Sequence, residues 1–507
     1  MNSDNKTSTF FAFLLFTLSS IFTLCVNIAA ATIDEHFTIV FTSGMAEINL
    51  DHNQSGHAHL NSLLKTLRAE NEHVIFLHGG DALSPGILSA IDKGAHMISI
   101  LNELSPDAMA VSKSELAHQE DELSLRTFEA NFPITNCNIY DPLTSGPLEG
   151  IFPHLLLTVG AFNVGLLSAV DPEVIADYLP QRIQTNNINE AVAKNAKQLR
   201  EKGADIVVLM AGFNIDTFNT HFVTPPVDIV LLSKTSGDTG LTQQGNSLFE
   251  LKGHEDFVAI INLHVIKNDT ETSWTGTSRL VKIKDYSPDP NLEKKIAAYV
   301  NQLSGVLSQV IGMTRTHLDT RRESVRTGEN AFANFTTDSL KEFFNSDIVL
   351  LNGGIFRANK EYPLGSNLTV GDIQKEFPFH NRIVNIRVSG AMLRNSLENG
   401  LSRIEDIKGR FPHVSGMRVE YNKNDLPLQR LVSINVNGQP LDLKNMYTLT
   451  TSDFLANGGD GYTELPKAER IVKIHETRLL WEYVKNQIVA KGAISPIIDG
   501  RMKALHP

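Results

Sequence analysis

Short apolar runs that alternate with helical stripes constrain the fold of the first half of the chain most strongly. Residues 37–42 form one such run, and residues 74–77 form another that ends in Gly79-Gly80-Asp81. The segment between them places leucines on one helix face, at Leu60, Leu63, Leu64 and Leu67. A further helical stripe covers 188–199, and strand-like runs cover 205–210 and 228–232. Strands and helices in this order predict a layered α/β domain.

The length of the chain requires a second domain. It has 507 residues, whereas single hydrophobic cores rarely grow beyond about 250–300 residues. Pro288-Asp289-Pro290 interrupts the first pattern, and a helix is expected from about 291 to 308. We therefore predict a first domain over 36–285, a hinge or linker helix over 286–310 and a second domain over 311–507.

The second half predicts a different mixture of strands and helices. A strand over 348–351 leads into Asn352-Gly353-Gly354, and a helix is expected over 476–490. Another strand over 431–436 leads into Asn437-Gly438, which is a strong signal for a tight hairpin turn. This half is also α/β.

The N-terminus predicts a targeting segment. Residues 7–33 carry no charged side chain, and Ala29-Ala30-Ala31 offers small residues before a cleavage point. We predict a signal peptide over 1–31 and a periplasmic or extracellular location. An uncleaved membrane anchor is the alternative, because about 20 apolar residues can span a bilayer. Cys137 is then the one remaining cysteine, and we expect it to be an inert, inward-facing strand residue.

The overall charge argues against nucleic acid as a partner. The net charge is −12, and no basic stripe suited to a phosphate backbone is visible. We expect contact with a membrane only through an uncleaved N-terminal segment.

Several segments of the second half suit a nucleotide. Asn352 through Arg357 combine an amide, two glycines and a guanidinium, and residues 454–462 combine an aromatic ring with Asp460. Residues 377–381 add a second aromatic ring and an amide, and two arginines lie four residues apart at 322 and 326. Aromatic faces can enclose a base, arginines pair with phosphate, and a carboxylate accepts hydrogen bonds from ribose.

In combination these segments resemble the C-terminal domain of 5'-nucleotidases, which include bacterial UDP-sugar hydrolases and animal ecto-5'-nucleotidases. The resemblance covers roughly 321–462 and includes Asn-Gly-Gly-x-x-Arg at 352–357, Val414-Ser415-Gly416 and the Gly-Gly-Asp-Gly-Tyr loop at 458–462. It implies that a nucleotide or nucleoside binds to a set of side chains with divided roles. Phe379 and Phe454 would stack the base, Asn381 and Asp460 would hold sugar or base edges, Arg322, Arg326, Asn352 and Arg357 would face sugar and phosphate, and Gly416 would line the pocket.

The first half resembles the calcineurin-like metallophosphatase domain of the same family from Phe37 to about Ile266, which implies a four-layer αββα fold. In active members two metal ions activate a water molecule for attack on phosphorus. Of the seven ligand positions that the resemblance implies, only Asp81 keeps its ligand. The other six are Gly44, Ala46, Lys113, Gly212, Lys234 and Ser236, and the two positions of the catalytic dyad are Ser114 and Ala117.

These departures predict a binding protein that hydrolyses its ligand poorly or not at all, that is, a pseudoenzyme without a metal cofactor. Residual or rebuilt 5'-nucleotidase or nucleotide-sugar hydrolase activity with Zn²⁺, Mn²⁺ or Mg²⁺ is the alternative, and a protein-interaction module on the same scaffold is another. We expect Lys113 to pair with Asp81 where a metal is lost. We also expect His52, His57 and His59 to lie in a solvated loop rather than in a replacement metal site.

Overall fold

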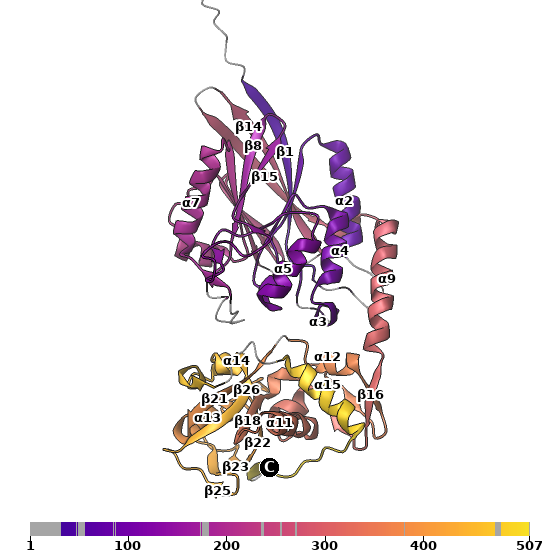
Figure 1. Ribbon diagram of the computed structural model, residues 1–507, viewed down its shortest axis with the longest axis vertical. Helices are drawn as coiled ribbons and strands as arrows, with labels where there is room; N and C mark the ends of the chain where they lie inside the picture. Colours follow the sequence, from indigo (N-terminus) through magenta and orange to yellow (C-terminus); the bar gives the residue numbers. More distant parts are fainter. Residues whose placement is uncertain are drawn as a thin grey trace, which may run out of the picture.

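The computed structural model describes residues 32–46, 48, 56–84, 86, 88–172, 174, 182–234, 238–253, 256–268, 271–379, 381–471 and 478–505. The predicted signal peptide, His52, Ser236 and His380 lie outside these residues, as does the side chain of Lys234. Figure 1 shows two domains, one above the other, that are connected by the helix α9.

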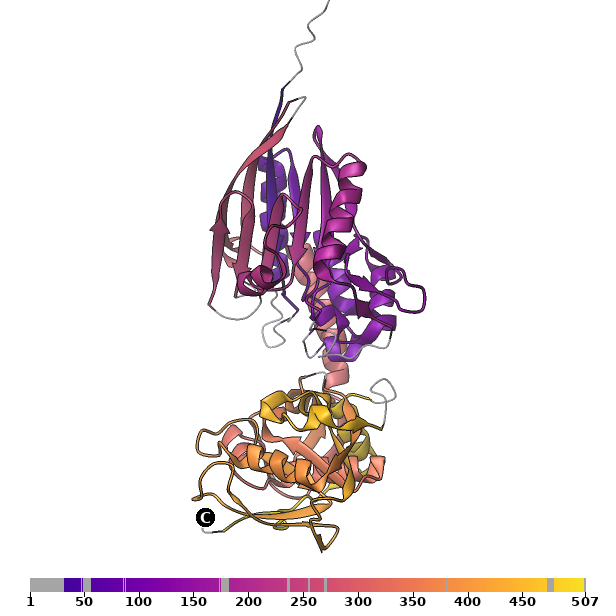
Figure 2. The same ribbon diagram turned by 90° about the vertical axis from the view of Figure 1, so that its left-hand side faces the viewer.

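Two sheets form the centre of the first domain, and Figure 2 shows them from the side. The larger has the strand order β15-β14-β1-β2-β3-β4-β6, and the smaller has the order β12-β13-β11-β10-β8-β7. The strands of the larger sheet are β1 (Ile33–Thr42), β2 (Val74–His78), β3 (Ala108–Ala110), β4 (Ile134–Thr135), β6 (Ile151–Phe152), β14 (Phe257–Lys267) and β15 (Thr272–Lys282). Those of the smaller sheet are β7 (Leu155–Val159), β8 (Phe162–Ala169), β10 (Ile206–Ala211), β11 (Ile229–Lys234), β12 (Gly240–Gln244) and β13 (Leu248–Lys252). Strands β5 (Ile139–Tyr140) and β9 (Gln184–Thr185) pair separately.

The two sheets pack face to face, and helices cover both outer faces. Alternate residues of β2 show this: Ile75 and Leu77 lie in the core shared with the smaller sheet, whereas Phe76 packs with the leucines of α2 on the outer side. The helices on that side are α2 (Gly56–Glu70), α3 (Ser89–Asp92), α4 (Ala95–Leu104) and α5 (Gln119–Glu129). Those of the smaller sheet are α7 (Ile188–Glu201) and α8 (Ile215–His221). The predicted αββα layering is confirmed.

The connecting helix α9 (Pro290–Leu307) belongs to the first domain by its packing. Proline occupies its first turn, and the Asp289 carboxylate accepts hydrogen bonds from the next two backbone amides at 3.2 and 3.0 Å. One apolar stripe is buried in the same core as α2, namely Leu292, Ile296, Val300 and Leu303. Just after the helix, the carbonyl of Gln309 accepts a hydrogen bond of 3.0 Å from the Val370 amide of the second domain.

The second domain contains a five-stranded sheet of order β22-β18-β26-β21-β27 and a four-stranded sheet of order β25-β24-β23-β29. Their strands are β18 (Ile348–Asn352), β21 (Ile383–Ser389), β22 (Pro412–Ser415), β23 (Met417–Asn422), β24 (Leu431–Val436), β25 (Gln439–Pro440), β26 (Met446–Ser452), β27 (Glu469–Arg470) and β29 (Met502–Leu505). Smaller sheets use β16 (Val310–Thr314), β17 (Leu318–Asp319), β19 (Glu361–Tyr362), β20 (Asn367–Thr369) and β28 (Ala493–Ile494). The helices are α10 (Arg322–Thr327), α11 (Ala331–Phe344), α12 (Val370–Glu376), α13 (Gly390–Leu401), α14 (Asp453–Ala456) and α15 (Leu480–Lys491).

The hairpin turn and the C-terminal helix that the sequence predicted for this domain are both present. Val436 pairs with Gln439 across the Asn437-Gly438 turn, and both turn residues have positive φ, of 48° and 83°. Positive φ at both central residues is what a two-residue hairpin with a type I′ turn requires. The expected C-terminal helix begins at Leu480, a little later than predicted.

Two expectations for the first domain need correction. His57 does not lie in a solvated loop: it is the second residue of helix α2, which begins at Gly56, and it is only 1% exposed. Burial, followed by the charges of His78 and His96, lowers its pKa to about 3. His59 instead contacts the Tyr286 carbonyl at 2.6 Å. Cys137 is buried as expected, although it lies between β4 and β5 rather than in a strand, and burial raises the pKa of its thiol to about 12.

Candidate nucleotide-binding site

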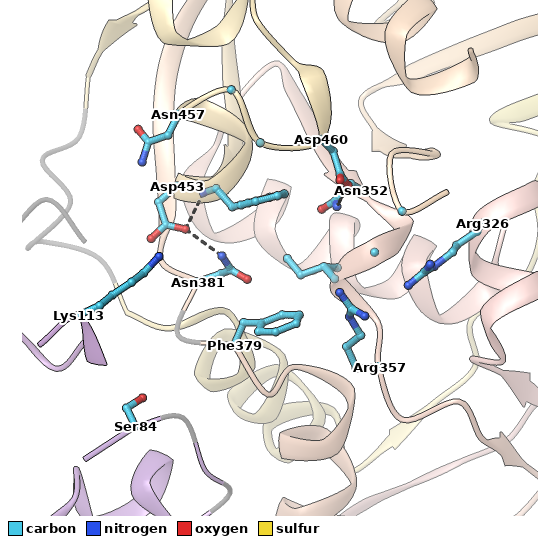
Figure 3. A pocket seen from close by; sticks show the side chains of 16 residues that line it. Ser84, Lys113, Arg326, Asn352, Arg357, Phe379, Asn381, Asp453, Asn457 and Asp460 are labelled. Carbon is cyan, nitrogen blue, oxygen red and sulfur yellow. Dashed lines mark hydrogen bonds between the residues drawn. The ribbon is translucent and has the colours of Figure 1, made fainter. Parts of the chain in front are cut away.

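A cavity of about 770 Å³ lies where the second domain faces the first. Figure 3 shows its lining, which combines aromatic, amide, carboxylate and cationic side chains. Two of the lining residues, Ser84 and Lys113, belong to the first domain. The others come from the second domain: Arg326, Asn352, Gly354, Ile355, Arg357, Phe379, Asn381, Gly409, Asp453, Phe454, Asn457, Gly458, Gly459 and Asp460. Most of the residues that the sequence predicted for binding are therefore brought together.

The carboxyl end of β18 forms one wall of the cavity. The strand ends at Asn352 and passes into a turn of 3-10 helix over Gly353–Ile355. A Cβ atom on Gly353 would lie 2.0 Å from the carbonyl oxygen of Val325 in α10. Only glycine allows this approach, which sets α10 and its Arg326 beside the end of the strand.

The loop that follows α14 meets this wall. The side-chain amide of Asn352 donates a hydrogen bond of 2.7 Å to a carboxylate oxygen of Asp460. Asp460 itself has a φ of 54°, and the preceding Gly458 has a φ of 91°. The pair therefore fixes a strained loop and holds a carboxylate at the cavity surface.

The two predicted stacking rings both line the cavity. Phe379 is 42% exposed and Phe454 is 44% exposed. The Arg357 guanidinium lies over the Phe379 ring, 4.8 Å from its centroid. The Phe454 ring lies against Gly459, where a Cβ atom would come within 2.5 Å of it. Each ring is thus supported by a neighbour while much of its surface stays accessible, as a base-stacking platform needs.

Asp453 organises the polar end of the cavity and was not recognised in the sequence. Its carboxylate is buried, and it accepts hydrogen bonds from the backbone amides of Phe454 (2.8 Å) and Arg382 (3.1 Å) and from the Asn381 side chain (3.2 Å). Burial raises the pKa of Asp453 to about 6. The predicted ligand Asn381 is therefore oriented by this carboxylate. The one sequence signal for the role of Asp453 was its position directly before Phe454, which was predicted to stack on the base.

Arginines give the cavity its cationic character. Burial lowers the pKa of Arg326, and the charges of Arg357 and Arg322 lower it further. The Arg326 Nε atom is buried and has no hydrogen-bond partner within the described parts of the chain. A cluster of guanidinium groups with an unused donor favours an anionic ligand. Arg322 differs from the prediction, because its side chain is exposed and does not line the cavity.

Gly416 also does not line the cavity, contrary to the prediction. Strand β22 runs antiparallel to β18, so that Asn352 pairs with Pro412 and Val349 pairs with Ser415. The start of β22 therefore lies next to the cavity, and Gly416, which follows its end, lies at the opposite edge of the sheet. There it packs against the carbonyl of Asp347, with a φ of 78°.

The loops that the sequence assigned to a metal centre converge beside Asp81. The Gly44 amide donates to the Gly80 carbonyl at 2.8 Å, which joins the first two loops. A Cβ atom on Gly212 would lie 2.1 Å from the Ser112 hydroxyl, so the third and fourth loops also meet. The chain therefore builds the expected loop cluster.

Among the described side chains at the ligand positions that the resemblance implies, few can bind a divalent metal ion. Gly44, Ala46 and Gly212 offer no side-chain donor, and Asp81 is the one acidic side chain at the assigned ligand positions. Burial raises the pKa of Asp81. Hydrogen bonds from the Ser114 amide, at 2.9 Å, and from the serine hydroxyls of this loop lower it and so oppose that rise. Divalent ions need several carboxylate, imidazole or amide ligands.

Glu115 holds two of these loops together, a role that the sequence did not reveal. Its buried carboxylate accepts four backbone hydrogen bonds, from Asp81 (2.9 Å), Ala82 (2.8 Å), Leu83 (3.3 Å) and Ser112 (2.9 Å). Burial, followed by the charge of Asp81, raises the pKa of Glu115 to about 7. Its place directly after Ser114, the first position of the dyad, was the available signal.

The expected ion pair between Lys113 and Asp81 stays a prediction. The charge of Lys113 lowers the pKa of Asp81, and the Asp81 carboxylate also accepts a hydrogen bond of 2.9 Å from the Ser114 amide. Ser114 begins a 3-10 turn directly after Lys113. The Lys113 side chain is exposed and lines the nucleotide cavity, where Figure 3 shows it on the side of Asn381 and Asp453.

The fold and the site define a two-domain protein that joins a metallophosphatase-like αββα domain to a second α/β domain that forms most of the cavity. The profile of the 5'-nucleotidase C-terminal domain matches residues 310–467. The chain is 24% identical to the trifunctional nucleotide phosphoesterase protein YfkN of Bacillus subtilis over 91% of its own length, but it spans only 35% of that protein. It is 23% identical to the human 5'-nucleotidase, with 90% of this chain and 86% of the human protein covered.

Solved structures of other proteins share the fold. A putative 5'-nucleotidase from Staphylococcus aureus, solved with alpha-ketoglutarate, superposes with a TM-score of 0.70 at 15% identity and covers 93% of this chain and 100% of its own. A 5'-nucleotidase precursor from Thermus thermophilus gives a TM-score of 0.58 at 21% identity, with the same coverage. The chain therefore carries a 5'-nucleotidase C-terminal domain over residues 310–467, and it shares the two-domain fold of these 5'-nucleotidases.

Proposed function

We propose that the chain binds a nucleotide or nucleoside outside the cytoplasm and does not hydrolyse it efficiently. The contrast between its two sites carries the proposal. The cavity of the second domain keeps two stacking rings, two lining arginines and a carboxylate, whereas the loop cluster of the first domain keeps Asp81 as its one family ligand among the described side chains.

The chemistry of phosphate ester hydrolysis explains why this contrast matters. Members of such families use metal ions to lower the pKa of a bound water and to stabilise charge on phosphorus, and an imidazole supports proton transfer. Here the dyad positions carry Ser114 and Ala117. Neither side chain exchanges protons near neutral pH, so these two positions do not supply the proton transfer that this route needs.

The cavity suits a ligand with a base at one end and an anionic group near the arginines. Phe379 and Phe454 would hold the base, and Asp460 would accept from ribose hydroxyls. Arg326 and Arg357 would pair with phosphate. Lys113 reaches the same cavity from the first domain, and in this proposal it supplies positive charge from the side where active relatives carry metal.

The proposal includes export through residues 1–31 and no nucleic-acid partner. A membrane would be contacted only if that segment were retained. No helix among the residues that the structure describes is both long and apolar enough to cross a membrane.

Calorimetric titration of the full chain with AMP and adenosine, in the presence of a chelator, tests the binding part. We expect both to bind and AMP to bind more tightly. Arg326→Ala should remove the preference for AMP, whereas Arg403→Ala, an exposed control that pairs with Asp406, should keep it. Equal affinity of the wild type for both ligands would contradict the assigned phosphate contacts, and no binding would contradict the function.

Phosphate release from AMP and from UDP-glucose tests the second part. With Mn²⁺ or Zn²⁺ present, release should stay far below the rates typical of enzymes, about 1 per second or faster. Release at such rates would establish the alternative, a 5'-nucleotidase or nucleotide-sugar hydrolase with a rebuilt centre. The similarity to named 5'-nucleotidases along about nine tenths of the chain favours that alternative.

A further inference from the structure

A second group of possible metal ligands lies at the other end of the first domain. Strands β1 and β14 are antiparallel neighbours, and their register places His36 directly opposite His264. Asp34 lies two residues before His36, on the same face of β1. Figure 1 shows this end of β1 and β14 on the side of the domain that faces away from the second domain.

This group is separate from the loop cluster at Asp81. Strand β1 ends at Thr42, two residues before Gly44 of that cluster. The six steps along the strand from His36 to Thr42 span about 20 Å, because an extended strand advances about 3.3 Å per residue. An ion at one place would therefore not contact ligands at the other.

The three side chains converge closely. The His36 and His264 rings stack with their centroids 4.4 Å apart and an interplanar angle of 11°. The His264 Nε2 atom lies 2.6 Å from a carboxylate oxygen of Asp34. One ligand atom from each residue can be chosen so that all three lie within 4.8 Å of one another. Among the residues that the structure describes, no other group of three or more such side chains meets this criterion.

We propose that Asp34, His36 and His264 form a binding site for a single late first-row divalent metal ion, with Zn²⁺ as the representative. Two imidazoles and one carboxylate suit such an ion, whereas Ca²⁺ and Mg²⁺ prefer oxygen ligands. Ligand atoms around tetrahedral zinc lie about 3.3 Å apart, from bonds of about 2.0–2.2 Å. The contact between His264 and Asp34 therefore opens slightly as the metal replaces the shared proton, and His36 moves inward.

The setting of the three residues favours this role over that of a simple surface ion pair. They stand on paired strands, so their backbone positions are fixed before a metal arrives. An exposed ion pair contributes little stability by itself, and a pair between Asp34 and His264 gives no role to the second imidazole stacked beside it. Asp34 and His36 are exposed, which leaves room for water or another group at a fourth position.

Zinc titration of the untagged full chain by calorimetry tests the site. We expect one saturable Zn²⁺ equivalent, and we expect His36→Ala and His264→Ala each to weaken its binding at least tenfold. Asp34→Asn should weaken it as well. Mg²⁺ should give no saturable signal. The melting temperatures of metal-free variants should match that of the wild type, because the replaced side chains are exposed or half-exposed.

Two control variants separate this site from other binding. His317→Ala removes a histidine from another exposed histidine–carboxylate contact, 4.0 Å from Glu361, and should leave zinc binding unchanged. Asp81→Asn should also leave it unchanged. The inference is overturned if the wild type shows no saturable equivalent, or if His36→Ala and His264→Ala bind zinc as the wild type does. Loss of binding in Asp81→Asn would overturn it too, by placing the metal in the loop cluster. None of these outcomes depends on nucleotide binding.

Discussion

Replacing Glu115 with glutamine tests whether a carboxylate, rather than a metal ion, holds the loop cluster together. One Glu115 oxygen accepts from the amides of Ala82 and Leu83, and the other accepts from those of Asp81 and Ser112. A glutamine of the same shape offers only one oxygen. In either orientation its NH₂ group therefore faces two buried backbone donors.

The expected loss follows from those two donors. A buried donor without a partner costs about 1–3 kcal/mol, so two cost about 2–6 kcal/mol. The measurement belongs at pH 8, because the raised pKa of about 7 leaves the carboxyl group ionised there. For a domain of 150–250 residues, a loss of 1 kcal/mol lowers the melting temperature by about 2–4 °C. Glu115→Gln should therefore lower the melting temperature of the first domain by at least about 4 °C.

Thermal and urea unfolding followed by circular dichroism would measure this loss. Glu149→Gln is the matched control, because Glu149 is exposed, and it should unfold as the wild type does. If Glu115→Gln melts within 1 °C of that control, the four amide contacts do not stabilise the loops. The cluster must then be held in another way, for example by a bound ion.

Three further outcomes are expected. Phe379→Ala and Phe454→Ala should each weaken nucleoside binding by about 1–3 kcal/mol, as the loss of one stacking face does elsewhere, and unchanged calorimetric affinities would place the base in another position. Burial raises the pKa of Glu376 from 4.5 to about 7. Between pH 4.5 and about 7 the folded state therefore holds more protons than the unfolded state. The free energy of unfolding should therefore fall as pH rises from about 4.5 to 7, and urea titrations should show a shallower fall for Glu376→Gln. Gly80→Ala should lower the melting temperature, because Gly80 has a φ of 88° and an added Cβ would lie 2.6 Å from a neighbouring side chain. Gly240→Ala is the control, because a Cβ there meets open space, and equal melting temperatures of the two variants would contradict the prediction.

The regular elements could be predicted because their signals are local. The helical stripe over 188–199 becomes α7 (Ile188–Glu201), and the run over 228–232 becomes β11 (Ile229–Lys234). Both elements bury the apolar positions that define the pattern. The Asn437-Gly438 turn needs no information beyond its own backbone preferences.

The direction of individual side chains could not be predicted, because it depends on register and on neighbouring loops. Gly416 follows a strand whose start, rather than its end, meets the cavity. Lys113 lines the cavity at the second domain, although the sequence assigned it to the loop cluster at Asp81. His57 lies in a stretch of polar residues, and only the packing of α2 reveals that its ring is buried. Motif resemblance identified the loops near Gly416 and Lys113, but it did not orient their side chains.

The packing of α9 has a mechanical consequence. The helix has 18 residues, so it is about 27 Å long at 1.5 Å per residue. Its buried stripe packs it onto the first domain, so a pivot between the domains is expected beyond Leu307, near the hydrogen bond between Val370 and Gln309. Such an arm amplifies motion: a turn of about 10° at the pivot displaces the far end of α9 by roughly 5 Å, given that length. Modest torsional changes in two or three residues could therefore withdraw Lys113 and Ser84 from the ligand cavity, and this would set how quickly a ligand escapes.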